Sequence, residues 1–195
     1  RFANDTMSAT YLAAVKDRLY CDAKDSARRR QTQTAIYQMT QGFAKLLAPV
    51  LAHTADEAWR ALYPGDDQAC VHLQSFEAIS AAIAAEQWPA AMEARSAGLL
   101  ALEQTRESGQ LDNPLDAQVT LANAGDALGA FEHDDLADLL GVSRVVLGDA
   151  VSVQSLANDP RCERSWKRDP SVRERTWEGD KVMLCDRDAE AVGAL

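Results

Sequence analysis

The stretch that decides the fold of this chain is residues 7–20, which have the sequence MSATYLAAVKDRLY. Its apolar residues recur at spacings of three and four, and this spacing places them on one face of an α-helix. They are Met7, Tyr11, Leu12, Val15 and Leu19. Lys16 and Arg18 fall off that face. We therefore predict an amphipathic helix whose apolar face packs against neighbouring helices.

Two more helices are predicted downstream. The second has Arg28, Arg29 and Arg30 in its first turn and ends near Pro49. In the third, residues 54–57 (TADE) have the form of a capping box, with Thr54 as the N-cap. Three antiparallel helices with short links form a bundle. The residues expected in its core are Leu12, Val15, Ile36, Met39, Phe43 and Trp59.

The second half of the chain has a different pattern. Pro89 suits the first turn of a long helix that runs to Gly109. Period-two alternation at 117–121 predicts a half-buried strand, residues 136–140 predict a short helix, and residues 145–147 and 151–153 predict two more strands. The expected fold is mainly α, with an antiparallel helical bundle (1–85), an α+β domain (86–160) and a small C-terminal module (161–195).

Composition narrows the class of protein. The chain has 195 residues, of which 47% are hydrophobic, so it can bury a core and is not intrinsically disordered. No window approaches 18 consecutive apolar residues, which predicts a protein without a membrane span, soluble and cytoplasmic. The four cysteines are widely scattered, which argues against a disulfide scaffold. We also expect a monomer, and a fragment of something larger.

The net charge of −10 hides a marked asymmetry. Residues 1–65 carry 9 Lys or Arg against 6 Asp or Glu, and residues 66–160 carry 3 against 16. Residues 161–195 carry 8 of each. This distribution predicts that a polyanion, if bound, contacts the two ends of the chain and not its middle.

A search for catalytic patterns finds none in the sequence. His53, His72 and His133 are not at metalloprotease spacing, and the chain has no glycine-rich phosphate loop, no G-x-S-x-G and no C-x-x-C. We expect each histidine to be an ordinary surface or core residue, and we do not expect a freestanding hydrolase. The three consecutive arginines suit phosphate, while salt bridges to Asp22 or Asp25 are the alternative role for them.

Three segments resemble the anticodon-binding region of class I aminoacyl-tRNA synthetases of the isoleucine/valine/leucine group. Residues 11–20 resemble that group's "Y-x-x-x-x-K-D-R-L-Y" helix, and residues 29–37 (RRQTQTAIY) are similar to the next helix. Residues 46–59 (LLAPVLAHTADEAW) resemble the stretch of that region that runs from "L-L-A-P" to "T-A-E-E". This chain differs from the family pattern at two positions, with Ala52 where a proline is usual and Asp56 where glutamate is commoner. The motifs "H-I-G-H" and "K-M-S-K-S" are absent, so the resemblance covers only the C-terminal part of such an enzyme.

The isoleucyl enzymes are the nearer match. Residues 88–106 and 111–117 resemble their region that follows the bundle, and the sustained heptads of a valyl coiled-coil arm are missing. Bacterial isoleucyl enzymes often end in a zinc module written C-x-x-C-W … C-x-x-C. This chain keeps Cys162, Trp166 and Cys185 at those positions but has Ser165 and Asp188 in place of the other two cysteines.

The resemblance implies isoleucine activation with ATP and transfer to tRNA-Ile by a complete enzyme, with this chain providing tRNA recognition beside the catalytic domain of the same protein. The alternatives are the same region of a valyl enzyme, or a non-catalytic structural or protein-interaction domain that does not contact RNA. The expected RNA contacts are Lys16, Lys24, Arg28, Arg29, Arg30, Arg161, Arg164, Trp166, Lys167 and Arg168.

The tail is expected to hold no zinc, and this fragment no cofactor. Structural zinc takes four ligands, commonly thiolates, and Ser165 is a very poor ligand because its hydroxyl would have to lose a proton. We expect Trp166, Trp177, Val182 and Leu184 to hold the module instead. Cys162 and Cys185 could pair if they lie close together, although a reducing cytosol opposes a disulfide.

Overall fold

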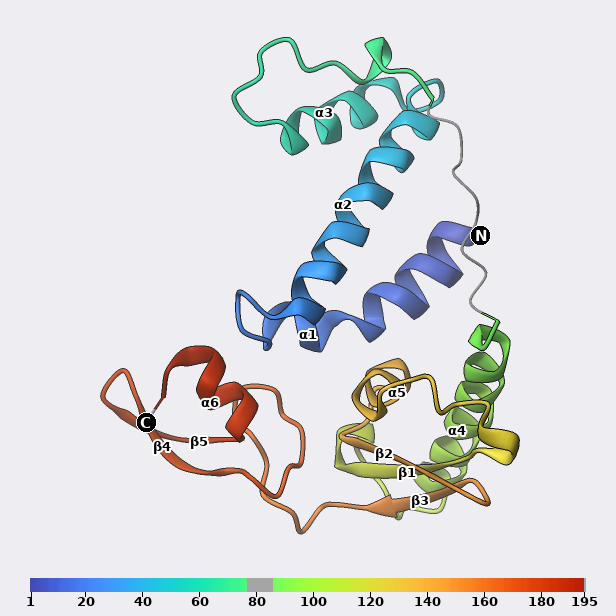
Figure 1. Ribbon diagram of the computed structural model, residues 1–195, viewed down its shortest axis with the longest axis vertical. Helices are drawn as coiled ribbons and strands as arrows, with labels where there is room; N and C mark the ends of the chain where they lie inside the picture. Colours follow the sequence, from blue (N-terminus) through green and yellow to red (C-terminus); the bar gives the residue numbers. More distant parts are fainter. Residues whose placement is uncertain (77–85, 195) are drawn as a thin grey trace. The chain divides into compact units, whose positions relative to one another are not determined.

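The computed structural model describes residues 1–76 and 86–194 (Figure 1). The chain divides into two compact units. One comprises residues 1–29 together with the chain from residue 84 onward, and the other comprises residues 30–83. Within the described ranges, the helices are all too short or too polar to cross a membrane.

The N-terminal segment contains two helices where the spacing predicts one. A π-helix covers Ala3–Leu12, and the α-helix α1 covers Lys16–Tyr20. Within it, Thr10 Oγ1 donates to the Asp5 carbonyl oxygen, five residues back, at 2.9 Å. A π-helix has a longer period than an α-helix, so the apolar stripe does not continue through it unchanged. Val15 is buried as predicted, whereas Leu12 is only half-buried.

The second unit is helical. Helix α2 (Ala27–Leu47) enters it from the first unit, followed by α3 (Ala52–Leu62) and a 3-10 turn at Val71–Leu73. Its core contains Ala44, Ala48, Ala55, Trp59, Ala69 and Val71. Trp59 is buried as predicted, and its ring centroid lies 5.0 Å from that of Tyr63. The other core residues predicted on α2, Ile36, Met39 and Phe43, are only half-buried.

The predicted capping box at Thr54 is wrong. Helix α3 begins at Ala52, and the residue before it, Leu51, makes no side-chain cap. The Leu51 carbonyl already accepts a hydrogen bond from the Ala55 N–H at 2.9 Å, so Thr54 lies inside the first turn. Asp56, the departure from the family pattern, accepts from the Val71 N–H at 3.0 Å and thereby ties the following loop to α3.

The α+β part contains α4 (Trp88–Glu107), β1 (Ala117–Ala122), α5 (His133–Leu140), β2 (Arg144–Gly148) and β3 (Ser152–Ser155). The sheet order is β2-β1-β3, with β1 parallel to β2 and antiparallel to β3. The predicted alternation is confirmed, because Ala117, Val119 and Leu121 are buried while the intervening residues are not. Leu102 of α4 and Leu136 and Leu140 of α5 complete this core.

The C-terminal module contains an antiparallel hairpin, β4 (Arg173–Trp177) with β5 (Asp180–Leu184), followed by α6 (Asp186–Val192). Its core contains Cys162, Val172, Leu184, Cys185 and Ala189, with Val182 packed against it. The predicted tryptophan core is wrong: Trp166 is 59% exposed and Trp177 is 36% exposed. Cysteine and aliphatic side chains form this core instead of the indole rings.

The mixed α and α+β character is confirmed, and the domain boundaries at 85 and 160 stay a prediction. Residues 1–29 belong to the same unit as the α+β part and the C-terminal module. Ion pairs join these segments, since Arg18 and Arg28 both pair with Asp138 of α5, more than 100 residues away. The antiparallel bundle stays a prediction, because its helices fall into the two units.

Candidate functional site

A buried carboxylate, Asp138 on α5, forms ion pairs with three cations. Its side chain has no exposed surface. Lys167 Nζ lies 2.8 Å from Oδ1, while Arg18 Nη2 and Arg28 Nη2 lie 3.0 and 3.3 Å from Oδ2. One acidic side chain therefore joins the N-terminal segment, α5 and the C-terminal module.

Asp17 on α1 is a second node of the same network. Lys167 Nζ lies 3.2 Å from its Oδ2, and Arg187 of α6 donates to both of its oxygens. Burial alone would raise the pKa of Asp17, but the hydrogen bond from Arg187 and the charge of Lys167 outweigh it and lower the pKa from 3.8 to about 2. Burial likewise would lower the pKa of Lys167, and Asp138 and Asp17 reverse that effect and raise it.

Asp116, just before β1, holds two of the arginines predicted to contact RNA. Arg161 Nη2 lies 2.8 Å and Arg168 Nε 2.6 Å from Asp116 Oδ1. Burial would raise the pKa of Asp116, but the hydrogen bonds from Arg168 and Arg161 lower it. Arg168 also donates to the Asp159 carbonyl oxygen at 2.7 Å. Both guanidiniums therefore anchor the start of the C-terminal module to the sheet.

Three more of the predicted arginines, Arg28, Arg29 and Arg164, are also engaged inside the first unit. Arg28 Nε lies 3.3 Å from Asp22 Oδ2, and Arg29 Nη1 donates to the Asp22 carbonyl oxygen at 2.8 Å. Arg164 donates to the carbonyl oxygens of Tyr20 and Cys21, at 2.8 Å for Tyr20. The alternative role for the arginine run, salt bridges to Asp22, is therefore what the structure shows for Arg28.

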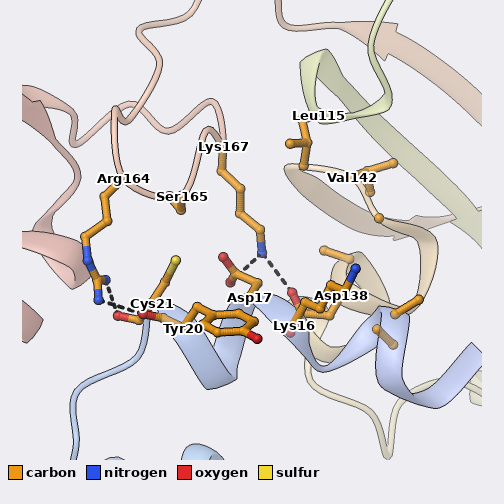
Figure 2. Close-up of a pocket in the computed structure, with 14 residues that line it drawn as sticks. Lys16, Asp17, Tyr20, Cys21, Leu115, Asp138, Val142, Arg164, Ser165 and Lys167 are labelled. Atoms are coloured by element: carbon orange, nitrogen blue, oxygen red, sulfur yellow. Dashed lines mark hydrogen bonds and ion pairs between the residues drawn. The ribbon is translucent and has the colours of Figure 1, made fainter. Parts of the chain in front are cut away.

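Four of the predicted contact residues present their side chains to solvent. They are Lys16, Lys24, Arg30 and Trp166. Lys16 lines a cavity of about 280 Å³ together with Tyr20, a residue that is 74% exposed. Figure 2 shows this cavity, with Lys167 reaching between Asp17 and Asp138 and Arg164 reaching to the end of α1. The walls include the apolar side chains of Leu115 and Val142.

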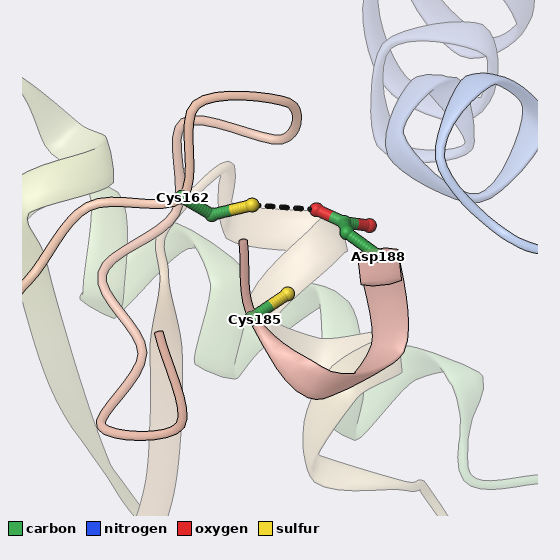
Figure 3. A group of neighbouring side chains, drawn as sticks. All are labelled: Cys162, Cys185 and Asp188. Carbon is green, nitrogen blue, oxygen red and sulfur yellow. Dashed lines mark hydrogen bonds between the residues drawn. The ribbon is translucent and has the colours of Figure 1, made fainter. Parts of the chain in front are cut away.

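A cluster of sulfur and carboxylate groups lies in the C-terminal module (Figure 3). The ligand atoms of Cys162, Cys185 and Asp188 all lie within 4.8 Å of one another, and all three residues are buried. Cys162 Sγ donates to Asp188 Oδ2 at 2.9 Å, and both cysteines are free thiols. The structure thus brings together three of the four positions that the family resemblance relates to zinc. The expectation of a metal-free tail stays a prediction.

Sequence reasoning missed the acidic partners Asp17, Asp116 and Asp138, together with Arg18 and Arg187. One signal was available. An acidic middle block between basic ends suits an external polyanion, but opposite charge in one compact unit also predicts that the segments neutralise each other. The pairs between Asp138 and Arg18, Arg28 and Lys167 are of this kind.

Comparison with known proteins assigns the chain to a family. The family model "Anticodon-binding domain of tRNA ligase" matches residues 1–121. The chain therefore belongs to the family of tRNA-ligase anticodon-binding domains, as the motifs of residues 11–59 predicted.

Its relatives include isoleucine–tRNA ligases. The protein from Brachyspira hyodysenteriae is 34% identical over 205 residues, covering 95% of this chain and 22% of the relative. Isoleucine–tRNA ligase 1 of Burkholderia mallei is 35% identical over 199 residues, covering 95% and 20%. The enzyme from Azoarcus sp. is 34% identical over 201 residues, covering 97% and 21%. The chain thus spans about a fifth of the length of these relatives.

Proposed function

We propose that this chain is the tRNA-recognition part of an isoleucine–tRNA ligase and that it binds the anticodon stem-loop of tRNA-Ile. The observation that carries the proposal is the anticodon-binding family match over residues 1–121 in a chain whose relatives are isoleucine–tRNA ligases. The whole protein would activate isoleucine with ATP and charge tRNA-Ile through a catalytic domain of the same polypeptide. The proposal includes the antiparallel packing of the first three helices and a monomeric, cytoplasmic enzyme.

The exposed side chains suit single-stranded RNA. Loop bases stack on aromatic rings while Lys and Arg neutralise the adjacent phosphates. Trp166 and Tyr20 are exposed aromatic residues, and Lys16 and Lys24 are exposed cations in the same unit. Arg30 is an exposed cation of the second unit. We therefore assign RNA contact to these five residues first.

The remaining predicted contacts have a different role in this proposal. Arg28, Arg29, Arg161, Arg164, Lys167 and Arg168 hold the N-terminal segment, the sheet and the C-terminal module together. A guanidinium that is already bonded to a carboxylate gains less from a phosphate, because the first partner must be released. These six residues shape the binding surface and do not provide its free charge.

A charge-removal experiment tests the assignment. The double variant Lys16→Ala with Lys24→Ala is compared with Lys181→Ala, a lysine on β5 whose side chain is 73% exposed. Filter binding of a tRNA-Ile transcript at several salt concentrations measures affinity and the number of neutralised phosphates. We expect the double variant to lose roughly 1–3 kcal/mol and to show a shallower salt slope, while the control binds as the parent does. Unchanged binding by the double variant would remove Lys16 and Lys24 from the interface.

The two alternatives make different predictions in the same assay. A valyl module would bind a tRNA-Val transcript more tightly than tRNA-Ile. A structural or protein-interaction domain would bind neither transcript at low salt. Specific, salt-dependent binding of tRNA-Ile separates the proposed function from both.

A further inference from the structure

The cysteine–aspartate cluster of the C-terminal module does not have a donor set that fits zinc. Structural zinc sites are tetrahedral and closed by four ligands. Here two positions are thiols, Cys162 and Cys185, and the other two are Ser165 and Asp188. Ser165 Oγ is buried. An alcohol must lose a proton to ligate strongly, so the fourth ligand is missing.

Both oxygens of the Asp188 carboxylate already have partners inside the module. Its side chain has no exposed surface, and its Oδ2 accepts from Cys162 Sγ at 2.9 Å. Its Oδ1 lies 3.2 Å from Arg164 Nη1 and 3.0 Å from Arg187 Nη2. Burial alone would raise the pKa of Asp188, and the hydrogen bond from Cys162 and the charge of Arg187 lower it instead. A zinc ion at this carboxylate would displace or face two guanidinium charges at short range.

We infer that the C-terminal module folds without a metal ion, and that Arg164 and Arg187 supply the positive charge that zinc supplies in related modules. The two guanidiniums neutralise the buried Asp188 from one side while the Cys162 thiol binds it from the other. The aliphatic core around Leu184 and Ala189 then closes over the cluster.

The use of Arg164 and Arg187 in place of a zinc ion has a structural consequence that zinc would not have. Arg164 also donates to the carbonyl oxygens of Tyr20 and Cys21, and Arg187 also binds Asp17. The groups that neutralise Asp188 therefore fasten the module to both ends of α1. A zinc ion held by four side chains of the module would stabilise the module alone.

Metal analysis of the full chain, expressed with zinc in the medium and purified without chelator, tests the inference. We expect far less than one zinc per chain and the same Tm with and without EDTA. About one zinc per chain that is lost in Cys162→Ser, or a Tm that falls in EDTA, would overturn it. Cys70→Ser, outside the cluster, is the matched control for the cysteine change.

A gain-of-function variant tests the geometry independently. Ser165→Cys combined with Asp188→Cys restores four thiols, and we expect about one zinc per chain and an EDTA-sensitive Tm. Failure of this variant to take up zinc or Co²⁺ while its circular dichroism matches that of the parent would show that the four positions do not converge.

The role of the arginines is tested by Arg187→Met, with Arg173→Met, 61% exposed, as control. We expect Arg187→Met to lower the Tm of the parent clearly more than the control does. Its effect should be smaller in the four-cysteine variant, which lacks Asp188. Equal effects of Arg187→Met in both backgrounds would contradict the proposed replacement.

Discussion

Replacing Asp138 with Asn is expected to be among the most destabilising single substitutions in this chain. The Asn side chain keeps the shape and one acceptor oxygen but removes the charge that three cations share. Lys167, Arg18 and Arg28 lie 2.8, 3.0 and 3.3 Å from this carboxylate, and Asp138 itself is fully buried. The substitution would therefore leave positive charge in a poorly hydrated place without its main partner.

The magnitude follows from how buried those cations are. Removing one partner of a buried ion pair typically costs 3–5 kcal/mol. The side chains of Lys167, Arg18 and Arg28 are 15%, 14% and 27% exposed, and each keeps a second carboxylate, so the lower end of that range applies. We expect a loss of about 3 kcal/mol, equivalent to roughly 6–12 °C in Tm for a chain of this size.

The assay is urea unfolding of the full chain, followed by circular dichroism at 222 nm. Asp134→Asn is the matched control, because Asp134 lies on the same helix, is 81% exposed and is 3.9 Å from Arg28. We expect the control to change stability by less than about 0.5 kcal/mol. A loss below about 1 kcal/mol for Asp138→Asn would refute the assignment of Asp138 as the centre of the network.

Three further predictions concern RNA binding, pH and packing. Trp166→Ala should weaken tRNA-Ile binding by about 1–3 kcal/mol with little change in Tm, because the ring is 59% exposed; a fall in Tm with unchanged binding would contradict this. The pKa of Asp17 is lowered to about 2, so its ionised form contributes about 2 kcal/mol to the free energy of unfolding above pH 4. This contribution is lost as the pH falls through 2. Asp17→Asn should therefore make the free energy of unfolding depend less on pH between 4 and 2, and an unchanged pH dependence would argue against it. Gly98→Ala should cost about 1–3 kcal/mol in urea unfolding, since its Cβ would lie 2.7 Å from Leu140 Cδ2. Gly42→Ala, with open space around the Cβ position, should instead gain about 0.5–1 kcal/mol, and equal effects at the two positions would contradict the packing described for α4.

The elements that the sequence predicts well are those whose signal is local. The alternation at 117–121 reports burial on one face of β1, and the leucines at 136–140 report one face of α5. Both patterns can be recognised from residues that are close together in the sequence. The predicted start of α3 at Thr54 is wrong. A capping box at Thr54 competes with an ordinary helical hydrogen bond from the Ala55 N–H to the Leu51 carbonyl oxygen, and the sequence does not show which of the two forms.

The ion-pair network could not be predicted in the same way. Arg18 and Asp138 are 120 residues apart, so no spacing rule joins them. Basic residues at the ends of the chain suit both a phosphate backbone and an acidic partner within the chain, and only the fold decides between the two. The prediction for Trp166 fails for a different reason. A large apolar ring favours a core position, but small residues such as Cys162 and Ala189 fill this core and Trp166 is exposed.

The most direct test of the account is binding of the anticodon stem-loop of tRNA-Ile by this chain. Fluorescence anisotropy of a labelled stem-loop, titrated at several salt concentrations, compares the natural loop with one whose anticodon bases are replaced. We predict that log K falls linearly with log salt concentration and that the natural loop binds more tightly at every salt concentration. Absence of binding at low salt, or equal affinity for the two loops, would contradict the claim that this chain recognises the anticodon of tRNA-Ile.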